Sequence, residues 1–125
     1  MKFLPDTNAL ISYFEGKEPD KNFLTELIAK EELFISPVVV AELRPRTNTD
    51  DQKKLNDLIG SGTVIPIDLE IGFMAGQYRE QFSKKTKKVY LLDCLIAATC
   101  KAHDLALITN NLKDYPMKDI KIIKP

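Results

Sequence analysis

Short apolar runs alternate along the chain with segments whose apolar residues recur at helical spacing. The apolar runs predict strands at residues 2–6, 33–35, 64–67, 105–108 and 120–123. Helices are predicted between them, at residues 7–14, 23–28, 37–43, 50–59, 69–82 and 93–102. Strands that alternate with helices in this way are typical of an α/β sandwich built around a mostly parallel sheet.

One segment, residues 36–43, is compatible with two structures. Ser36 is a good helix cap and Pro37 suits a first helical position, and together they predict a helix. The β-branched run at residues 38–40 is also compatible with a strand. Because Ala-Glu-Leu continues the segment, we favour the helix. Loops or turns are expected at residues 45–49, 60–62 and 109–115.

Composition predicts a single domain spanning residues 1–125 without an overall charge. The 18 basic and 18 acidic side chains cancel, so no global basic field marks a nucleic-acid-binding protein. Any contact with nucleic acid must therefore come from a local patch. The run that contains Lys84, Lys85, Lys87 and Lys88 is a candidate for contacts with RNA phosphates, and the alternative is a solvated loop.

The cysteines and the amino-terminal residues bear on the compartment. Asp6 comes too early for a signal peptide, and no apolar run approaches the roughly 20 residues that span a bilayer. Cys94 and Cys100 share one predicted helix, where a rise of ~1.5 Å per residue separates their Cα atoms by about 9 Å, beyond disulfide reach. We therefore expect reduced thiols, a cytoplasmic protein and no membrane partner.

Acidic and amide side chains stand where predicted strands end. Asp6 ends the first strand, Glu42 lies in the helix after the second, Asp93 opens the apolar helix, and Asn111 and Asp114 follow the strand at 105–108. In a parallel sheet, the carboxyl ends of the strands form the edge at which ligands bind. Carboxylates crowded together there raise one another's pKa unless a cation keeps them ionised. An all-oxygen donor set suits Mg²⁺ or Mn²⁺ better than Zn²⁺.

Each acid, taken alone, has a structural interpretation. Asp6 or Asp93 can cap a helix, Glu42 can be a solvated helix residue, and Asp114 can be a turn residue. The functional interpretation is favoured because the predicted topology brings all four to one edge of the sheet.

Four segments, residues 3–11, 35–43, 92–99 and 107–115, resemble in order the four motifs of PIN-domain nucleases. Within that family, the length of the chain and the residues of these motifs are most similar to VapC-type toxins of bacterial and archaeal toxin–antitoxin pairs. This resemblance implies a three-layer sandwich, with a mostly parallel central sheet of four or five strands flanked by helices. It also implies a Mg²⁺- or Mn²⁺-dependent endoribonuclease, a homodimer and a small cognate antitoxin.

The resemblance also implies roles for the acids. Asp6, Glu42 and Asp93 match the acidic metal-ligand positions of the family, with Glu42 as a ligand or as the base that orients water. Asn111 stands where many relatives carry Asp, and Asp114 follows three residues later. We expect Asn111 or Asp114 to give outer support.

Other polar residues near the motifs are expected to act by hydrogen bonding. Thr7, Asn8 and Ser36 are expected to hold loops and helix ends. Cys100 and His103 lie three residues apart on one predicted helix face, which suggests cysteine catalysis. Because that segment is strongly apolar, inert packing is the better interpretation.

Two further classes of function fit an α/β chain of this length. A phosphoacceptor receiver domain needs adjacent acids after its first strand, whereas Asp6 is followed by Thr7 and Asn8. A catalytically weak RNA- or protein-binding module with the same fold is the stronger alternative, because Asn111 leaves the acidic set incomplete.

Overall fold

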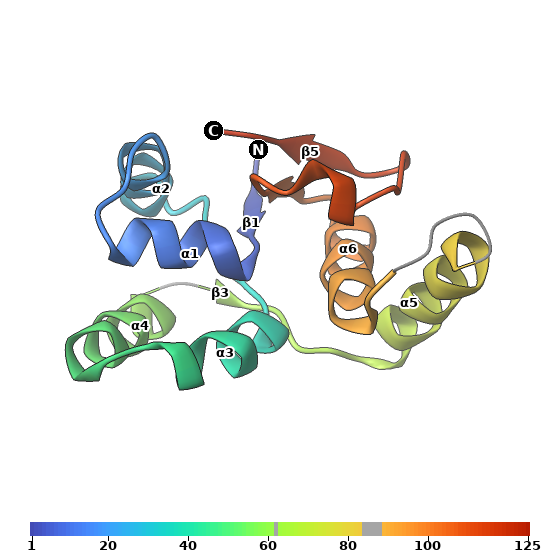
Figure 1. Cartoon of the computed structure of the whole chain (residues 1–125), viewed down its shortest axis with the longest axis horizontal. Helices are drawn as coiled ribbons and strands as arrows, with labels where there is room; N and C mark the ends of the chain where they lie inside the picture. Colours follow the sequence, from blue (N-terminus) through green and yellow to red (C-terminus); the bar gives the residue numbers. More distant parts are fainter. Residues whose placement is uncertain (62, 84–88) are drawn as a thin grey trace.

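The computed structural model describes residues 1–61, 63–83 and 89–125 (Figure 1). The strands of this part are β1 (Phe3–Pro5), β2 (Phe34–Ile35), β3 (Thr63–Val64), β4 (Ala106–Ile108) and β5 (Lys121–Ile123). The helices are α1 (Thr7–Phe14), α2 (Asp20–Ala29), α3 (Pro37–Leu43), α4 (Thr49–Ser61), α5 (Leu69–Phe82) and α6 (Leu91–His103). Two short 3-10 turns, η1 (Arg44–Arg46) and η2 (Leu112–Asp114), lie in segments that the sequence predicted as loops. The predicted α/β alternation is confirmed.

All described strand pairings are parallel. A three-stranded sheet has the order β1-β4-β5, with Leu4 opposite Leu107 and Pro5 opposite Ile108. β2 and β3 form a separate pair, which an isolated bridge between Phe3 and Leu33 joins to β1. The four or five strands expected are therefore a sheet of three with a pair attached, and β1 lies in the middle.

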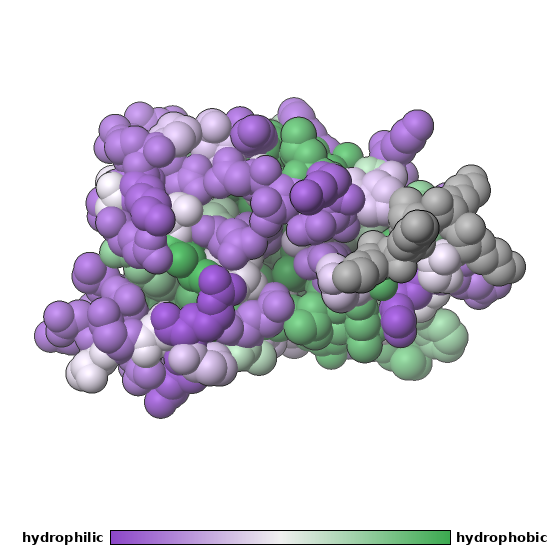
Figure 2. Space-filling view, viewed as in Figure 1, coloured by the Kyte–Doolittle hydropathy of each residue, from purple (hydrophilic) through white to green (hydrophobic). Residues whose placement is uncertain are grey.

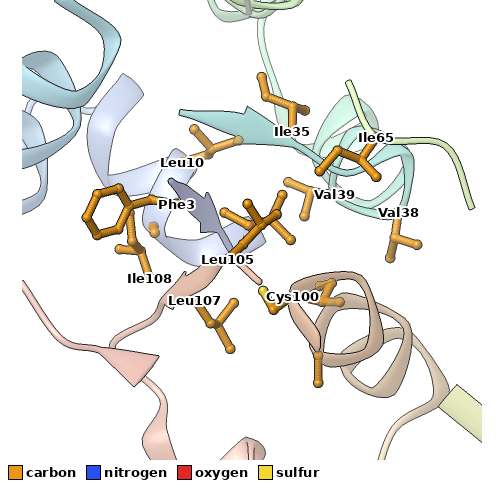
Figure 3. Packing of buried hydrophobic residues seen from close by; sticks show 14 of the residues in the cluster. Phe3, Leu10, Ile35, Val38, Val39, Ile65, Cys100, Leu105, Leu107 and Ile108 are labelled. Carbon is orange, nitrogen blue, oxygen red and sulfur yellow. The ribbon is translucent and has the colours of Figure 1, made fainter. Parts of the chain in front are cut away.

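The core forms where helices cover the central strands. β1 and β4 are buried along their whole length, as expected of parallel strands covered on both faces. Figure 1 shows α1 and α2 on one side of β1 and α5 and α6 on the other. Figure 3 shows Leu10 of α1, Val39 of α3 and Cys100 of α6 around the strands. α6 is apolar nearly all round and is largely buried, as its sequence predicted.

Three segments test the predicted boundaries. Only Thr63 and Val64 pair with β2, so the strand expected over 64–67 is wrong beyond its first residue. Gly60 and Ser61 belong to the end of α4 rather than to a turn, and Gly62 lies outside the described residues. The helix prediction for 37–43 is confirmed, and the Ser36 hydroxyl accepts from the Val38 N–H at 3.1 Å as the expected cap.

The described residues contain no helix long and apolar enough to cross a membrane. Cys94 and Cys100 are both free and buried, as expected. Burial raises the pKa of the Cys94 thiol to about 11 and that of Cys100 to about 12. The two thiols are therefore unreactive packing groups, in agreement with the sequence interpretation.

Candidate functional site

Asp6 lies at the carboxyl end of the central strand and is held at both carboxylate oxygens. Its Oδ1 accepts from the Ala9 N–H at 2.9 Å, which makes Asp6 the cap of α1. Its Oδ2 accepts from the Thr109 hydroxyl at 2.5 Å. Because Pro5 pairs with Ile108, the residues that follow them, Asp6 and Thr109, are also neighbours. Capping and a place in the candidate site are therefore compatible roles for this side chain.

Glu42 reaches the same edge from α3. The Thr7 hydroxyl, at the start of α1, donates to Glu42 Oε1 at 2.8 Å. Thr7 is itself buried, so this hydrogen bond ties α3 to α1 beside Asp6. The predicted role of Thr7 as a hydrogen-bonding support agrees with this geometry.

Asp93 is the third residue of α6, and the cap position of that helix belongs to Tyr90. The expectations that Asp93 opens or caps the helix are therefore wrong, because the helix starts two residues earlier at Leu91. Its side chain instead accepts at Oδ1 from the Tyr115 hydroxyl at 3.3 Å. Tyr115 is buried and follows η2, so the loop after β4 orients Asp93.

These side chains surround a small cleft of about 70 Å³. Its lining residues are Asp6, Thr7, Asn8, Glu42, Arg46, Asp93, Ile96, Asn111, Asp114 and Tyr115. A volume of this size holds an ion with a few waters and not a nucleotide. The cleft can therefore enclose an ion but not a larger ligand.

The structure thus brings most of the predicted site residues together. Asp6, Glu42, Asp93 and Asp114 all line the cleft, although they come from four segments that lie far apart in the sequence. Ser36 does not line it, because its buried hydroxyl caps α3. The predicted RNA-contacting residues Lys84, Lys85, Lys87 and Lys88 lie outside the described residues.

Two carboxylates of the cleft, Asp93 and Asp6, have a raised pKa, chiefly because they are buried. Burial first, and then the charge of Asp114, raise the pKa of Asp93 to about 6, against the lowering effect of the Tyr115 hydroxyl. Burial also raises the pKa of Asp6, opposed by the hydrogen bonds from Thr109 and Ala9. Both carboxylates are therefore less readily ionised than in water, and a cation in the cleft would relieve this cost.

The donor set has the chemistry of a site for a hard divalent cation. Every acidic lining side chain offers carboxylate oxygen, which Mg²⁺ and Mn²⁺ prefer. Within residues 1–61, 63–83 and 89–125, no three His, Cys, Asp or Glu side chains converge as a complete set of metal ligands. The fit of a divalent cation to this cleft therefore rests on the oxygen donors and on the repulsion between the carboxylates, and not on a coordination geometry.

A second layer of polar contacts supports the loop after β4. The Thr109 hydroxyl accepts from the Asn111 N–H at 3.0 Å while it donates to Asp6. Asn110 donates to Asp20 Oδ2 at 2.8 Å, and Asp20 is only 2% exposed at the start of α2. Sequence analysis missed the part that Thr109 and Asp20 play here. The parallel register of β1 and β4 would have identified Thr109, whereas Asp20 carries no local signal.

A family model and two known proteins match most of this chain. Residues 3–120 match the family model of the PIN domain. The chain is 31% identical over 114 residues to Ribonuclease VapC10 of Mycobacterium tuberculosis, covering 91% of this chain and 86% of that protein. It is 30% identical over 122 residues to Ribonuclease VapC2 of Rickettsia felis, covering 92% of this chain and 90% of that protein.

A solved structure from Rickettsia felis has a similar fold. It is the crystal structure of VapBC2 bound to a DNA fragment from their promoter, and it matches this chain with a TM-score of 0.83. The two chains are 23% identical, and the match covers 98% of each. At this identity the likeness shows the fold, and the fold agrees with the α/β architecture expected from the sequence.

Proposed function

Because this chain belongs to the PIN domain family, we propose that it is a metal-dependent endoribonuclease and the toxin of a type II toxin–antitoxin pair. The observation that carries the proposal is the cleft at the carboxyl edge of β1 and β4, which four carboxylates line. A hydrolase that cleaves phosphodiester bonds needs a water made nucleophilic and a phosphate held in line with it. The relatives that support the proposal are named ribonucleases.

We propose Asp6, Glu42 and Asp93 as the residues that hold Mg²⁺ or Mn²⁺. A bound ion would supply a water of lowered pKa and would neutralise charge on the scissile phosphate. Asp6 is suited to a fixed ligand because Ala9 and Thr109 hold both of its oxygens in place. Glu42 has one oxygen committed to Thr7, which leaves the other to bind the ion or to accept a proton from the attacking water.

The loop after β4 has a supporting role in this proposal. Tyr115 orients Asp93 through its hydroxyl, and Asp114 adds negative charge to the cleft. Asn8 and Asn111 line the cleft as neutral side chains, suited to hydrogen bonds with waters or phosphate oxygens. Because Asn111 is neutral, Asp114 is the acid of this loop that can complete the set.

The proposed partners are RNA as substrate and a small cognate antitoxin as inhibitor. The support for an antitoxin is that the similar solved structure is a VapBC complex. We further propose that the chain is a single domain that acts in the cytoplasm, where its buried free thiols remain reduced.

A homodimer is also proposed, and an exposed apolar face supports it. Leu69 and Phe73 of α5 are 76% and 66% exposed, and Leu91 and Leu92 of α6 are 46% and 41% exposed. Figure 2 shows hydrophobic side chains gathered over the side of the molecule where α5 and α6 lie. Apolar patches of this kind are typical of protein–protein contacts. Sedimentation of the isolated chain tests the dimer, and monomer at all micromolar concentrations contradicts it.

The nuclease is tested by RNA cleavage in EDTA and in graded Mg²⁺ or Mn²⁺. We expect no cleavage in EDTA, recovery with added metal, and no recovery in the Asp93→Asn variant. RNA binding without cleavage at saturating metal would favour the alternative, a catalytically weak PIN-fold binding module.

A further inference from the structure

Arg46 stands apart from the other side chains of the acidic cleft. Among the described residues that line the cleft it is the only basic one. The side chain is exposed, and no ion pair within 4.0 Å joins it to any described carboxylate. Arg44, two residues earlier, is also exposed but does not line the cleft.

The turn that carries Arg46 is fixed on both sides. It follows α3 directly as η1, in which Pro45 restricts the backbone. The Thr47 hydroxyl donates to the Arg44 carbonyl at 2.8 Å and closes the turn. Asn48 then accepts from the Asp51 N–H at 2.8 Å at the start of α4. The position of Arg46 is thus determined by a short, hydrogen-bonded connection between two helices.

The nearest preceding acid does not pair with Arg46. Glu42 lies four residues earlier, a spacing at which helical ion pairs form. Its Oε1, however, accepts from Thr7, and the described ion pairs do not include Glu42 with Arg46. The guanidinium of Arg46 therefore lines the acidic cleft without an ion pair to any described carboxylate.

A phosphodiester substrate needs such a cation. RNA is a polyanion, and a cleft with four carboxylates repels it. The planar guanidinium binds two phosphate oxygens at once, which fixes both position and orientation. We propose that Arg46 binds a phosphate of the RNA backbone at the mouth of the cleft and so positions the chain over the acids. This assignment rests on the proposed ribonuclease function.

Matched variants of the same turn test the assignment. Arg46→Ala, Arg46→Lys and the control Arg44→Ala are each made in the Asp93→Asn background, so that the RNA stays intact. Binding of a short fluorescein-labelled RNA is followed by anisotropy with Mg²⁺ at several salt concentrations. We expect Arg46→Ala to weaken binding roughly ten- to a hundredfold and to lower the salt slope by about 0.7. The RNA affinity of Arg46→Lys should lie between those of the parent and of Arg46→Ala. Arg44→Ala should leave RNA binding nearly unchanged.

Two outcomes overturn the assignment. One is an equal effect of Arg46→Ala and Arg44→Ala on RNA binding. The other is unchanged RNA binding in Arg46→Ala, which would leave Arg46 as a counter-charge for the acids. Absence of metal-dependent cleavage by the chain without substitutions would contradict the proposed function, whereas a specific loss of binding in Arg46→Ala would still support a phosphate-binding Arg46.

Discussion

The two ends of the parallel strands differ in size and in chemistry. At the carboxyl end the cleft is about 70 Å³, and four carboxylates line it. At the amino end a larger cleft of about 370 Å³ is lined by Lys2, Ile28, Glu31, Leu33, Phe34, Leu58 and Thr63. The lining of the larger cleft contains a single acid, so cleft volume does not single out the carboxyl end of the sheet. Concentration of charge identifies the candidate site.

Two cations at the amino end have an aromatic or acidic partner, whereas the described acids of the carboxyl-end cleft form hydrogen bonds but no ion pair. The Lys2 ammonium lies 5.2 Å from the centre of the Phe34 ring, and the amino terminus lies 3.9 Å from Glu32. At the carboxyl end, burial and the neighbouring acids raise the pKa of Asp93 and of Asp6. The described acids of the carboxyl end thus keep an unfavourable charge distribution, which a bound cation would relieve.

The largest expected effect concerns two acids at the carboxyl end. Asp6→Asn or Asp93→Asn should lower RNA cleavage by at least about a hundredfold, because each removes a charge from the proposed ion while nearly keeping the shape. The control is Glu31→Gln at the amino end, which removes an exposed acid of the larger cleft. Initial rates at saturating Mn²⁺ measure the difference. Equal rates for Asp6→Asn and Glu31→Gln would contradict the proposed metal site.

The second prediction concerns the amino end. Leu33 is 5% exposed, and Leu33→Ala should reduce the free energy of unfolding by about 2–4 kcal/mol through loss of buried surface and a residual cavity. Urea unfolding followed by circular dichroism measures this change. Cleavage per folded molecule should stay the same, and a large loss of activity in the folded fraction would show that the two ends are coupled.

The third prediction concerns the hydroxyl that joins the end of β4 to Asp6. Thr109→Val keeps the shape but removes the donor to Asp6 and the acceptor for the Asn111 N–H. Loss of these bonds should lower cleavage about tenfold, because a buried bond to a charged group contributes about 1.5–3 kcal/mol. Thr109→Ser retains the hydroxyl and should restore most of the rate. A Ser variant as slow as the Val variant would point to packing instead.

The smallest expected effect is on the pH dependence of stability in EDTA. The pKa of Asp93 is about 6 in the folded protein, above its ordinary 3.8, so the folded state binds this proton more tightly than the unfolded chain. Its stabilising contribution is full below about pH 4 and is lost as the pH rises through about 6. The contribution of Asp93 to the Tm should therefore fall over this range.

The Asp93→Asn variant isolates that contribution. The substituted amide cannot ionise, so the Tm of the variant should fall less over this range, and at about pH 8 it should exceed that of the parent chain by roughly 2 to 5 °C. Parallel Tm–pH curves for the two proteins would contradict the raised pKa.

Local signals in the sequence predicted most of the elements. Ser36 and Pro37 predicted the start of α3, and the apolar run of α6 predicted a buried helix. The strand expected over 64–67 was wrong beyond Val64, because an apolar run shows burial and not pairing. Ile65 is indeed buried, and its N–H still bonds to the Ile35 carbonyl, but the ladder ends there.

For the candidate site, the residue types and their order along the chain were determined by the sequence alone. Asp6 and Asp114 could be selected because each follows a predicted strand, Glu42 because it lies in the helix after the second strand, and Asp93 because it opens a predicted helix. Parallel strands end at one edge, where these segments meet. What only the tertiary structure decided is which groups surround them. Thr109 meets Asp6 through strand register, Tyr115 meets Asp93 across a loop, and Arg46 lines the acidic cleft without an ion pair among the described residues. These contacts join segments far apart in the chain, and their geometry depends on packing that no local pattern encodes.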